Sequence, residues 1–314
     1  MARATPVRAE AGAPTLGWNL ARDASQLFEY HFMVNALVAG SVVAVMAGVV
    51  GWMMVLRRET FAGHTLAMMA FPGASGAALA GVPAAWGYFA FCGAGALAIG
   101  RFAGARRRSW SERSANTAAV QALALATGFL FVSLYGGVLG DLENLLFGNL
   151  LGVSDGRLLG LGAVAAAAVA LLAALARPLL FASVDGEAAA ARGVPVRAVS
   201  IAFLVLLGLA VAATSQITGV MLVFALLVTP AASAQALTTR PALSLAITVA
   251  LGLVVVWLGL GISYYSVYPA GFFITVISFV IYLLARLLAA ALGRRSRERV
   301  PVPIASIPRG GVIG

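Results

Sequence analysis

The sequence predicts an all-α, polytopic membrane protein, and three observations point to this fold class. Of the 314 residues, 61% are hydrophobic and only 10% are charged, whereas a soluble domain carries roughly 25% charged residues. Apolar stretches of about twenty residues recur along the chain, and each is long enough to cross the hydrocarbon core of a bilayer. The arginines cluster at the ends of these stretches. We therefore expect about nine transmembrane helices, with eight to ten as the range.

The region between residues 31 and 292 is the predicted membrane domain. The number of spans stays open because 60–81 is rich in Gly and Pro, and because 141–153 has the character of a segment that dips into the membrane. In order along the chain, the nine expected spans are 32–56, 60–81, 84–104, 115–138, 157–182, 198–216, 219–238, 242–263 and 270–292.

Both ends of the chain differ from this domain. Residues 1–17 are rich in Ala, Pro and Arg and are expected to be disordered, and residues 18–30 mix apolar and charged side chains as an interfacial amphipathic helix does. Residues 1–30 are thus an N-terminal tail that includes this helix. Residues 293–314 begin with closely spaced arginines and continue with Pro and Gly, which predicts a basic, disordered cytoplasmic tail.

Arginine supplies all 21 basic residues, and its placement predicts the orientation of the chain. Connections rich in Arg stay on the cytoplasmic side of a membrane. The net charge of +10 therefore reflects membrane topology, and we expect no nucleic-acid partner. The alternation along the chain predicts an external N-terminus and a cytoplasmic C-terminus. The connections expected to be cytoplasmic contain residues 57–58, 106–108, 185–197, 240 and 294–299.

Two expected spans carry residues that weaken a helix. Pro72 and Gly73 lie inside the second span, and Thr229 and Pro230 lie inside the seventh. Proline removes a backbone hydrogen bond, and at membrane depth the freed group must be satisfied by neighbouring helices or by a water-filled path. These four residues are therefore candidates for lining a transport pathway. The alternative is a kink that shapes helix packing alone.

One polar segment, Asp185–Pro195, stands between long apolar runs. Its pattern predicts a short helix in which Asp185 is the N-cap, Glu187 lies in the first turn and Gly193 ends the helix. Such a helix between two spans is either a solvated loop or a surface bound by a soluble partner. The pattern alone leaves both interpretations open.

Four segments then follow one another in a characteristic order: Thr60–Gly73, Asn144–Leu151, Asp185–Gly193 and Gly219–Ala234. This ordered set resembles the permease subunits of ABC importers for manganese, zinc and iron, the ABC-3 family, which has a type II importer-like architecture. The likeness covers roughly residues 32–290. That family also has a Ser-Tyr-Tyr element before a Pro-x-Gly, which is matched here by Ser263–Tyr265 and Pro269–Gly271.

The resemblance implies a transport subunit that is not itself an enzyme. Two permeases pair in a membrane of lipid, with a homodimer expected. Two cytoplasmic ATP-binding subunits dock on their inner faces, and an extracytoplasmic binding protein delivers a transition-metal ion, zinc or manganese. The permease moves the ion by alternating access across the bacterial cytoplasmic membrane. It holds no cofactor, because ATP binds to the partner subunit and the metal is the substrate.

In this family the polar segment is the coupling helix that sits in a groove of the ATPase. The motif places Asp, Glu, Ala and Gly at fixed offsets, which here fall on Asp185, Glu187, Ala189 and Gly193, and Arg192 lies within the same helix. The resemblance therefore favours the partner-bound interpretation of this segment over the solvated loop. A rigid helix at this place transmits the movement of the ATPases to the spans.

The likeness departs from the family where the metal is expected to bind. In the family, the second span usually carries an Asp and, four residues later, a His on the same helix face. Here those two positions hold His64 and Met68. In addition, Val267 and Tyr268 occupy the stretch where the family has an acidic residue before its Pro-x-Gly.

Two interpretations of this departure stay open. In the first, His64 and Met68 face the pathway and bind a metal, because imidazole suits zinc and a thioether suits softer ions such as Cu(I). In the second, the site serves a chelated or organic solute, and His64 is a packing residue. Further methionines nearby either extend a soft surface or fill the core, and they are Met46, Met53, Met54 and Met69.

Other classes of function are weighed by what the chain contains. It has no Lys, so it cannot form a nucleotide-binding loop of the Gly-x4-Gly-Lys type, and it is not an ATPase alone. A secondary transporter driven by protons or sodium normally carries ionisable groups within its spans, and the expected interiors here are nearly free of them. A permease for a siderophore, haem or cobalamin is the remaining alternative.

Overall fold

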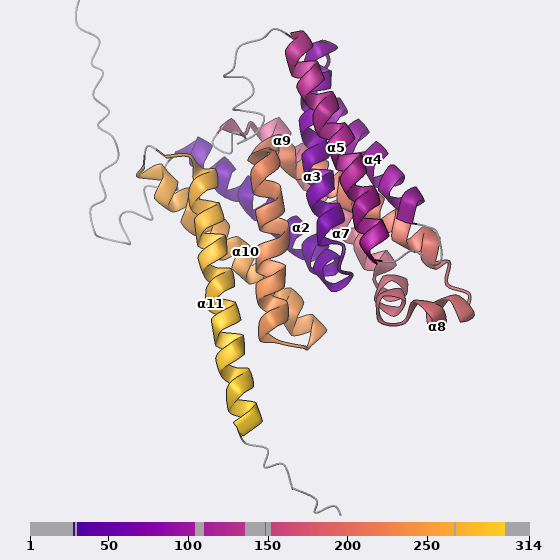
Figure 1. Ribbon diagram of the computed structural model, residues 1–314. Coiled ribbons are helices and arrows are strands. Elements are labelled where there is room, and N and C mark those ends of the chain that lie inside the picture. Colours follow the sequence, from indigo (N-terminus) through magenta and orange to yellow (C-terminus); the bar gives the residue numbers. More distant parts are fainter. Residues whose placement is uncertain are drawn as a thin grey trace, which may run out of the picture.

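The computed structural model describes residues 28, 30–103, 110–135, 148, 152–266 and 268–298. Within these residues the chain is helical apart from short connections, which confirms the predicted all-α class (Figure 1). The helices are α2 (His31–Leu56), α3 (Thr60–Leu79), α4 (Ala84–Ala103), α5 (Trp110–Tyr135), α7 (Asp155–Val184), α8 (Gly186–Ala191), α9 (Val196–Leu237), α10 (Pro241–Tyr264) and α11 (Ala270–Glu298).

Helix α9 is the central element and contacts α2, α3, α4, α7, α10 and α11. Its 42 residues are broken at Gly219, where φ is 75° and ψ is 165°, so two helical segments meet there. Ser200 in the first segment contacts Arg57, the C-cap of α2, and Gln235 in the second contacts Trp52 near the same end of α2. The chain therefore reverses direction at Gly219, and the two segments correspond to the predicted spans 198–216 and 219–238.

The helices run between two ends of the bundle. At one end, Arg57 donates to Ser200 at 2.9 Å and Trp52 donates to Ser244 at 3.0 Å, which joins α2 to the starts of α9 and α10. At the other end, His31 contacts Asp155 at the start of α7. We call these the α8 end and the His31 end. Of the five Arg-rich connections, 57–58, 185–197 and 240 lie together at the α8 end, and the side chains of 106–108 and 294–299 are outside the described part of the chain.

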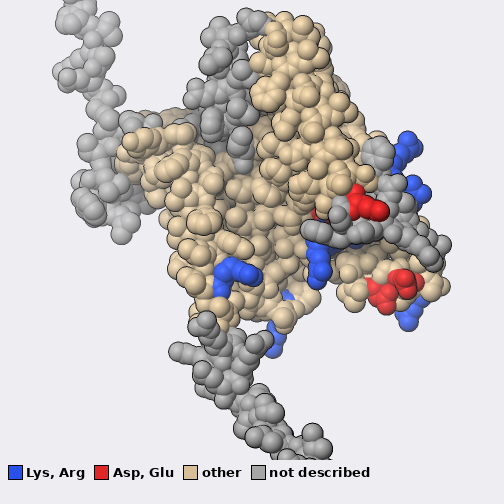
Figure 2. Space-filling model, in the orientation of Figure 1, with Lys and Arg blue, Asp and Glu red and all other residues tan. Residues whose placement is uncertain are grey.

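The outer helices expose large apolar side chains. Leu123 and Phe129 of α5 are 71% and 65% exposed, and Leu159 of α7 is 76% exposed. Figure 2 shows a surface almost without charge, with acidic and basic side chains gathered in a few places that include the region of α8. Hydrocarbon is the favourable neighbour for so large an apolar surface. The chain is therefore a multi-pass membrane protein.

Six described helical stretches are long and apolar enough to cross a membrane: α2, most of α5, α7, the first segment of α9, α10 and most of α11. The other three predicted spans also coincide with helices, namely α3, α4 and the second segment of α9. Helices α3 and α4 are less apolar because of their Gly content and, in α3, His64 and Pro72, and the apolar stretch 222–237 is shorter. Helices α3 and α4 pack closely against each other, at Gly73 and Gly87.

Some predicted boundaries shift. Helix α11 continues to Glu298, past the expected end of the last span at 292, because Arg and Glu are good helix formers outside the membrane as well. The helix predicted over 18–30 and the segment 141–153 fall outside the described residues, apart from residues 28 and 30 in the first and 148, 152 and 153 in the second.

Candidate functional site

Helix α8 forms as the sequence predicts, with both ends capped. The Asp185 carboxylate accepts hydrogen bonds from the backbone N–H groups of Glu187 at 3.0 Å and Ala188 at 2.9 Å. At the other end Gly193 adopts φ of 83°, a left-handed conformation that costs other residues energy, and the backbone N–H of Val194 bonds to the carbonyl of Ala189 at 3.0 Å. These caps hold a helix of six residues that is too short to be stable by itself.

The predicted coupling residues divide into two groups by exposure. Asp185, Glu187 and Gly193 are exposed. Arg192 is also exposed, and its guanidinium lies 5.7 Å from the ring centre of Phe181 in α7. Ala189 is fully buried. Ala189 therefore anchors α8 to its own chain, while the acidic first turn is presented outward.

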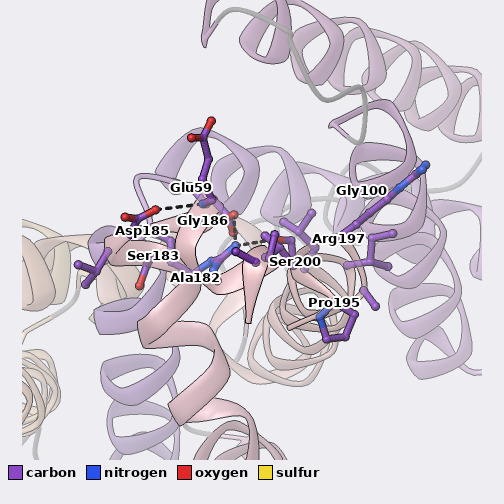
Figure 3. Close-up of a pocket in the computed structure, with 18 residues that line it drawn as sticks. Glu59, Gly100, Ala182, Ser183, Asp185, Gly186, Pro195, Arg197 and Ser200 are labelled. Carbon is purple, nitrogen blue, oxygen red and sulfur yellow. Dashed lines mark hydrogen bonds and ion pairs between the residues drawn. The ribbon is translucent and has the colours of Figure 1, made fainter. Parts of the chain in front are cut away.

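A cavity of about 1510 Å³ opens beside α8 (Figure 3). Its wall combines the end of α7 and the start of α8 with residues from α4 and α9, and Glu59 comes from the link between α2 and α3. Both acidic and basic groups line it, including Asp185 and Arg197. The cavity therefore joins the short helix α8 to the ends of the membrane helices.

Arg57, in the same cavity wall, connects three elements. Its Nη2 atom lies 2.9 Å from Oε1 of Glu59 and donates to Oγ of Ser200 in α9, also at 2.9 Å. Its guanidinium lies 5.2 Å from the ring centre of Phe203. The Arg57 side chain is only 7% exposed. From the sequence, Arg57 was used only to predict the orientation of the chain in the membrane, because nothing in the sequence indicates that its side chain turns inward.

His64 and Met68 lie one turn apart on α3, and both are half-buried. All the other residues of α3 from Ala62 to Ser75 are buried. The His64 ring packs edge-on against Phe224 of α9, with ring centres 4.7 Å apart. The Nδ1 atom of His64 is buried and has no hydrogen-bond partner among the described residues. Access to this face of α3 is thus confined to the two predicted positions.

The opposing face of α9 shows a matching pattern. Half-buried residues recur there at helical spacing, and they are Phe224, Ala225, Val228, Thr229 and Ala232. Since Phe224 contacts His64, the two faces adjoin. We call His64, Met68, Phe224, Val228 and Thr229 the α3–α9 seam. Thr229 belongs to this seam, whereas Pro72, Gly73 and Pro230 are buried behind it.

The three buried pathway candidates affect the helix backbone and its packing, because they are not presented to the seam. Pro72 lies in α3 and cannot donate to the carbonyl of Met68, and Pro230 in α9 cannot donate to that of Leu226. Gly73 packs against Gly87 of α4 so closely that an added Cβ would lie 2.5 Å from the Gly87 carbonyl oxygen. Gly73 is therefore a packing residue, and the two prolines free carbonyls near the seam.

The additional methionines belong to the core. Met46 and Met54 are fully buried, and Met53 and Met69 are 2% and 6% exposed. The interpretation of these four as filler is therefore the one that their burial favours. Across the described part of the chain, no group of three or more His, Cys, Asp or Glu side chains gathers that could hold a metal ion.

A polar cluster at the His31 end was not identified from the sequence. The Asp155 carboxylate accepts from the Asn35 amide at 2.7 Å and lies 3.2 Å from Nε2 of His31, and the Asn35 amide also donates to the Val153 carbonyl at 3.3 Å. Asn35 is only 7% exposed. The signal that could have found it is a polar Asn one helical turn after His31 within an apolar span.

The comparison with known families decides the identity of the chain. The sequence model of the ABC 3 transport family matches residues 29–289, which is most of the chain. The chain belongs to the ABC 3 transport family. Members of such transport families include membrane subunits, and the fold and the multi-pass character of this ABC 3 protein agree with that role.

Individual proteins that are similar to this ABC 3 protein include membrane proteins of transport systems. The chain is 30% identical to the manganese transport system membrane protein MntC of Halalkalibacterium halodurans, with 83% of this chain and 88% of the relative covered. It is 28% identical to the chelated iron transport system membrane protein YfeC of Yersinia pestis, over 82% and 86% of the two chains. Its fold is similar to PsaBC from Streptococcus pneumoniae, solved in complex with Fab, with a TM-score of 0.75, 27% identity and coverage of 87% and 99%.

Proposed function

We propose that this chain is the permease subunit of an ATP-driven importer that carries a transition-metal ion across the bacterial cytoplasmic membrane. The observation that carries the proposal is α8, a capped and exposed helix at one end of a chain of the ABC 3 transport family. The α8 end is the cytoplasmic end in this proposal, because the Arg-rich connections lie there. The C-terminus is then cytoplasmic too.

The exposed first turn of α8 is the proposed contact with a separate ATPase subunit. Asp185 and Glu187 place negative charge at the helix N-terminus, where it stabilises the helix and offers a complementary surface to basic groups. Two such subunits would act on two permeases. Their movement reaches the membrane helices through α7 and α9, the helices that α8 contacts.

The α3–α9 seam is the proposed path of the solute. His64 offers imidazole nitrogen, Met68 a thioether sulfur, and Thr229 a hydroxyl beside the carbonyl freed by Pro230. Zinc or manganese is the expected ion. Manganese is the metal in the name of a relative, and imidazole is a usual ligand of zinc. Because the seam is half-exposed, a second copy of the chain is proposed to cover it in a homodimer.

A chelated or organic solute is the second candidate. The seam is largely apolar, with Phe224, Val228 and Met68 beside one imidazole, and it holds no carboxylate. A hard ion such as Mn²⁺ prefers oxygen ligands, whereas a chelate brings its own. The similarity to a chelated iron permease supports this candidate. In either case an extracytoplasmic binding protein is expected to deliver the solute.

Elemental analysis of cells tests the proposal. Cells that lack this permease are compared with cells that carry it, in medium limited in transition metals. Selective loss of zinc or manganese and its recovery on complementation is the expected result. An unchanged content of every transition metal would contradict the metal proposal and favour the organic solute. The control is a complementing permease in which Asp185 and Glu187 are both replaced by Ala, which should restore nothing.

A further inference from the structure

The link between α2 and α3 is a fixed turn rather than a loose connection. The backbone N–H of Arg58 bonds to the carbonyl of Val55, and that of Glu59 bonds to the carbonyl of Met54, both at 3.0 Å. Arg58 adopts φ of 58°, which is uncommon for a residue with a side chain. Arg58 points outward as an exposed side chain, and Arg57 turns inward.

The burial of Arg57 is specified by its partners. A guanidinium taken out of water is costly unless it is paired and hydrogen-bonded. Here it has the Glu59 carboxylate, the Ser200 hydroxyl and the face of Phe203. Two of these partners lie within the first eight residues of α9, and the third immediately precedes α3. The position of α3 is thereby tied to the start of α9.

The same contacts place Arg57 between α8 and the seam. Pro195 ends the link from α8, and Val196 is the first residue of α9. Ser200 lies one turn further along α9, and all three residues line one cavity (Figure 3). On the other side, Glu59 is the N-cap of α3, and its carbonyl accepts from the N–H of Gly63 at 3.0 Å. Gly63 is adjacent to His64. A displacement of the start of α9 therefore reaches His64 through one ion pair, in which Arg57 is 7% and Glu59 is 23% exposed, and one helical turn.

We propose that Arg57 is the positioning residue that couples movement of α8 and the start of α9 to the α3–α9 seam. This inference rests on the proposed function, in which an ATPase acts on α8. Arg57 acts through Glu59 and Ser200 and does not touch the solute. The guanidinium is needed because its planar group holds the two Nη2 donors in fixed directions toward Glu59 and Ser200 while its face stacks on Phe203, whereas a Lys ammonium is compact, flexibly placed and more strongly hydrated.

The first test measures ions transported per ATP hydrolysed, with the permease, its ATPase and its binding protein reconstituted in vesicles. Arg57→Gln should lower this ratio by about fivefold or more, the lower end of coupling between two protein sites, while the complex still assembles and hydrolyses ATP. Arg57→Lys and the milder Ser200→Ala should fall in between. The matched control Arg58→Gln removes the neighbouring, exposed charge and should keep the wild-type ratio.

An unchanged ratio in Arg57→Gln would overturn the inference. A proportional loss of transport and of ATP hydrolysis, in Arg57→Gln and Ser200→Ala alike, would also overturn it, because a merely structural residue has that effect.

A second readout does not depend on the identity of the solute. Hydrogen–deuterium exchange measures the exchange rates of backbone amides in α8 and in the first turns of α3, before and after addition of the ATPase bound to a non-hydrolysable nucleotide. In the wild-type chain the exchange rates should change at both places, whereas in Arg57→Gln they should change at α8 alone. A response at α3 that persists in Arg57→Gln, or its absence from the wild type, would overturn this inference alone. A wild-type α8 that does not respond would overturn the proposed function and this inference with it.

Discussion

His64 occupies an unusual environment for an ionisable residue. It lies on a helix whose neighbouring positions are buried, it packs against an aromatic ring, and its Nδ1 atom lacks a partner within the described structure. An imidazole without a fixed hydrogen bond is free to turn toward a ligand. Met68, one turn further on, contributes a flexible and polarisable side chain that other apolar residues can replace. The two residues of the seam are therefore expected to contribute unequally.

This inequality is a testable prediction. His64→Ala removes the nitrogen ligand and should lower metal uptake by about tenfold or more, within the range for loss of a group that supports a metal site. Met68→Leu keeps the volume and should change uptake less. Uptake of radioactive or mass-labelled metal into cells, normalised to the amount of permease in the membrane, measures both. Wild-type uptake in both variants would make the seam a packing feature.

The residues of the seam show what a family resemblance can and cannot reveal. His64 and Met68 were predicted as a pair because they stand where the resembled family carries its Asp and its His, four residues apart on one helix face. Phe224 was not, because its contact with His64 depends on how α3 and α9 pack, and an aromatic residue within an apolar span has no distinguishing signal. The inward orientation of the Arg57 side chain was missed for a similar reason. Arginines at the ends of spans are normally solvated.

At the scale of single elements, α8 depends on its caps. The helix has six residues, and an isolated helix of that length is unstable. Its N-terminal cap, Asp185, satisfies two backbone donors, and its C-terminal end needs the left-handed conformation of Gly193. Loss of either cap therefore affects the whole element rather than one contact.

We predict that Gly193→Ala uncouples the permease from its ATPase without removing it from the membrane. The left-handed conformation costs an L-residue roughly 1–2 kcal/mol, enough to lower the ratio of ordered to disordered α8 by about fivefold or more. ATP hydrolysis by the reconstituted complex, with and without the permease, measures the effect. Gly156→Ala is the matched control. It also lies in open space, but with helical backbone angles. Equal stimulation in both variants would contradict the role of α8.

The elements were predicted well where polar residues interrupt apolar runs. The caps of α8 follow from single residues whose backbone preferences are strong, and the division of α9 falls at Gly219, where the predicted spans 198–216 and 219–238 meet. The end of α11 was not predicted, because the loss of hydropathy after residue 292 marks the edge of the apolar region and not the end of the helix. Charged residues such as Arg and Glu continue a helix readily.

At the scale of the whole molecule, the alternation of connections was predictable and the packing was not. Residues 57–58, 185–197 and 240 lie at one end, as the arginines indicated. The central position of α9 has no counterpart in the sequence, because its apolar character resembles that of the outer helices. Burial separates them: Phe203 and Leu207 are fully buried, whereas Leu123 of α5 is 71% exposed.

The chain allows a direct test of its orientation, because its one cysteine, Cys92, is fully buried and should not react with a membrane-impermeant maleimide. Ser154→Cys introduces a thiol at the His31 end and Ala191→Cys one in α8, both at exposed positions. If the α8 end is cytoplasmic, intact cells should label Ser154→Cys, and Ala191→Cys should be labelled only after permeabilisation. The unsubstituted chain measures the background. Added ATPase should protect the thiol in α8 and leave the other reactive, because only α8 is expected to lie in the docking surface. Labelling of Ala191→Cys in intact cells would reverse the orientation and place α8 out of reach of any cytoplasmic ATPase.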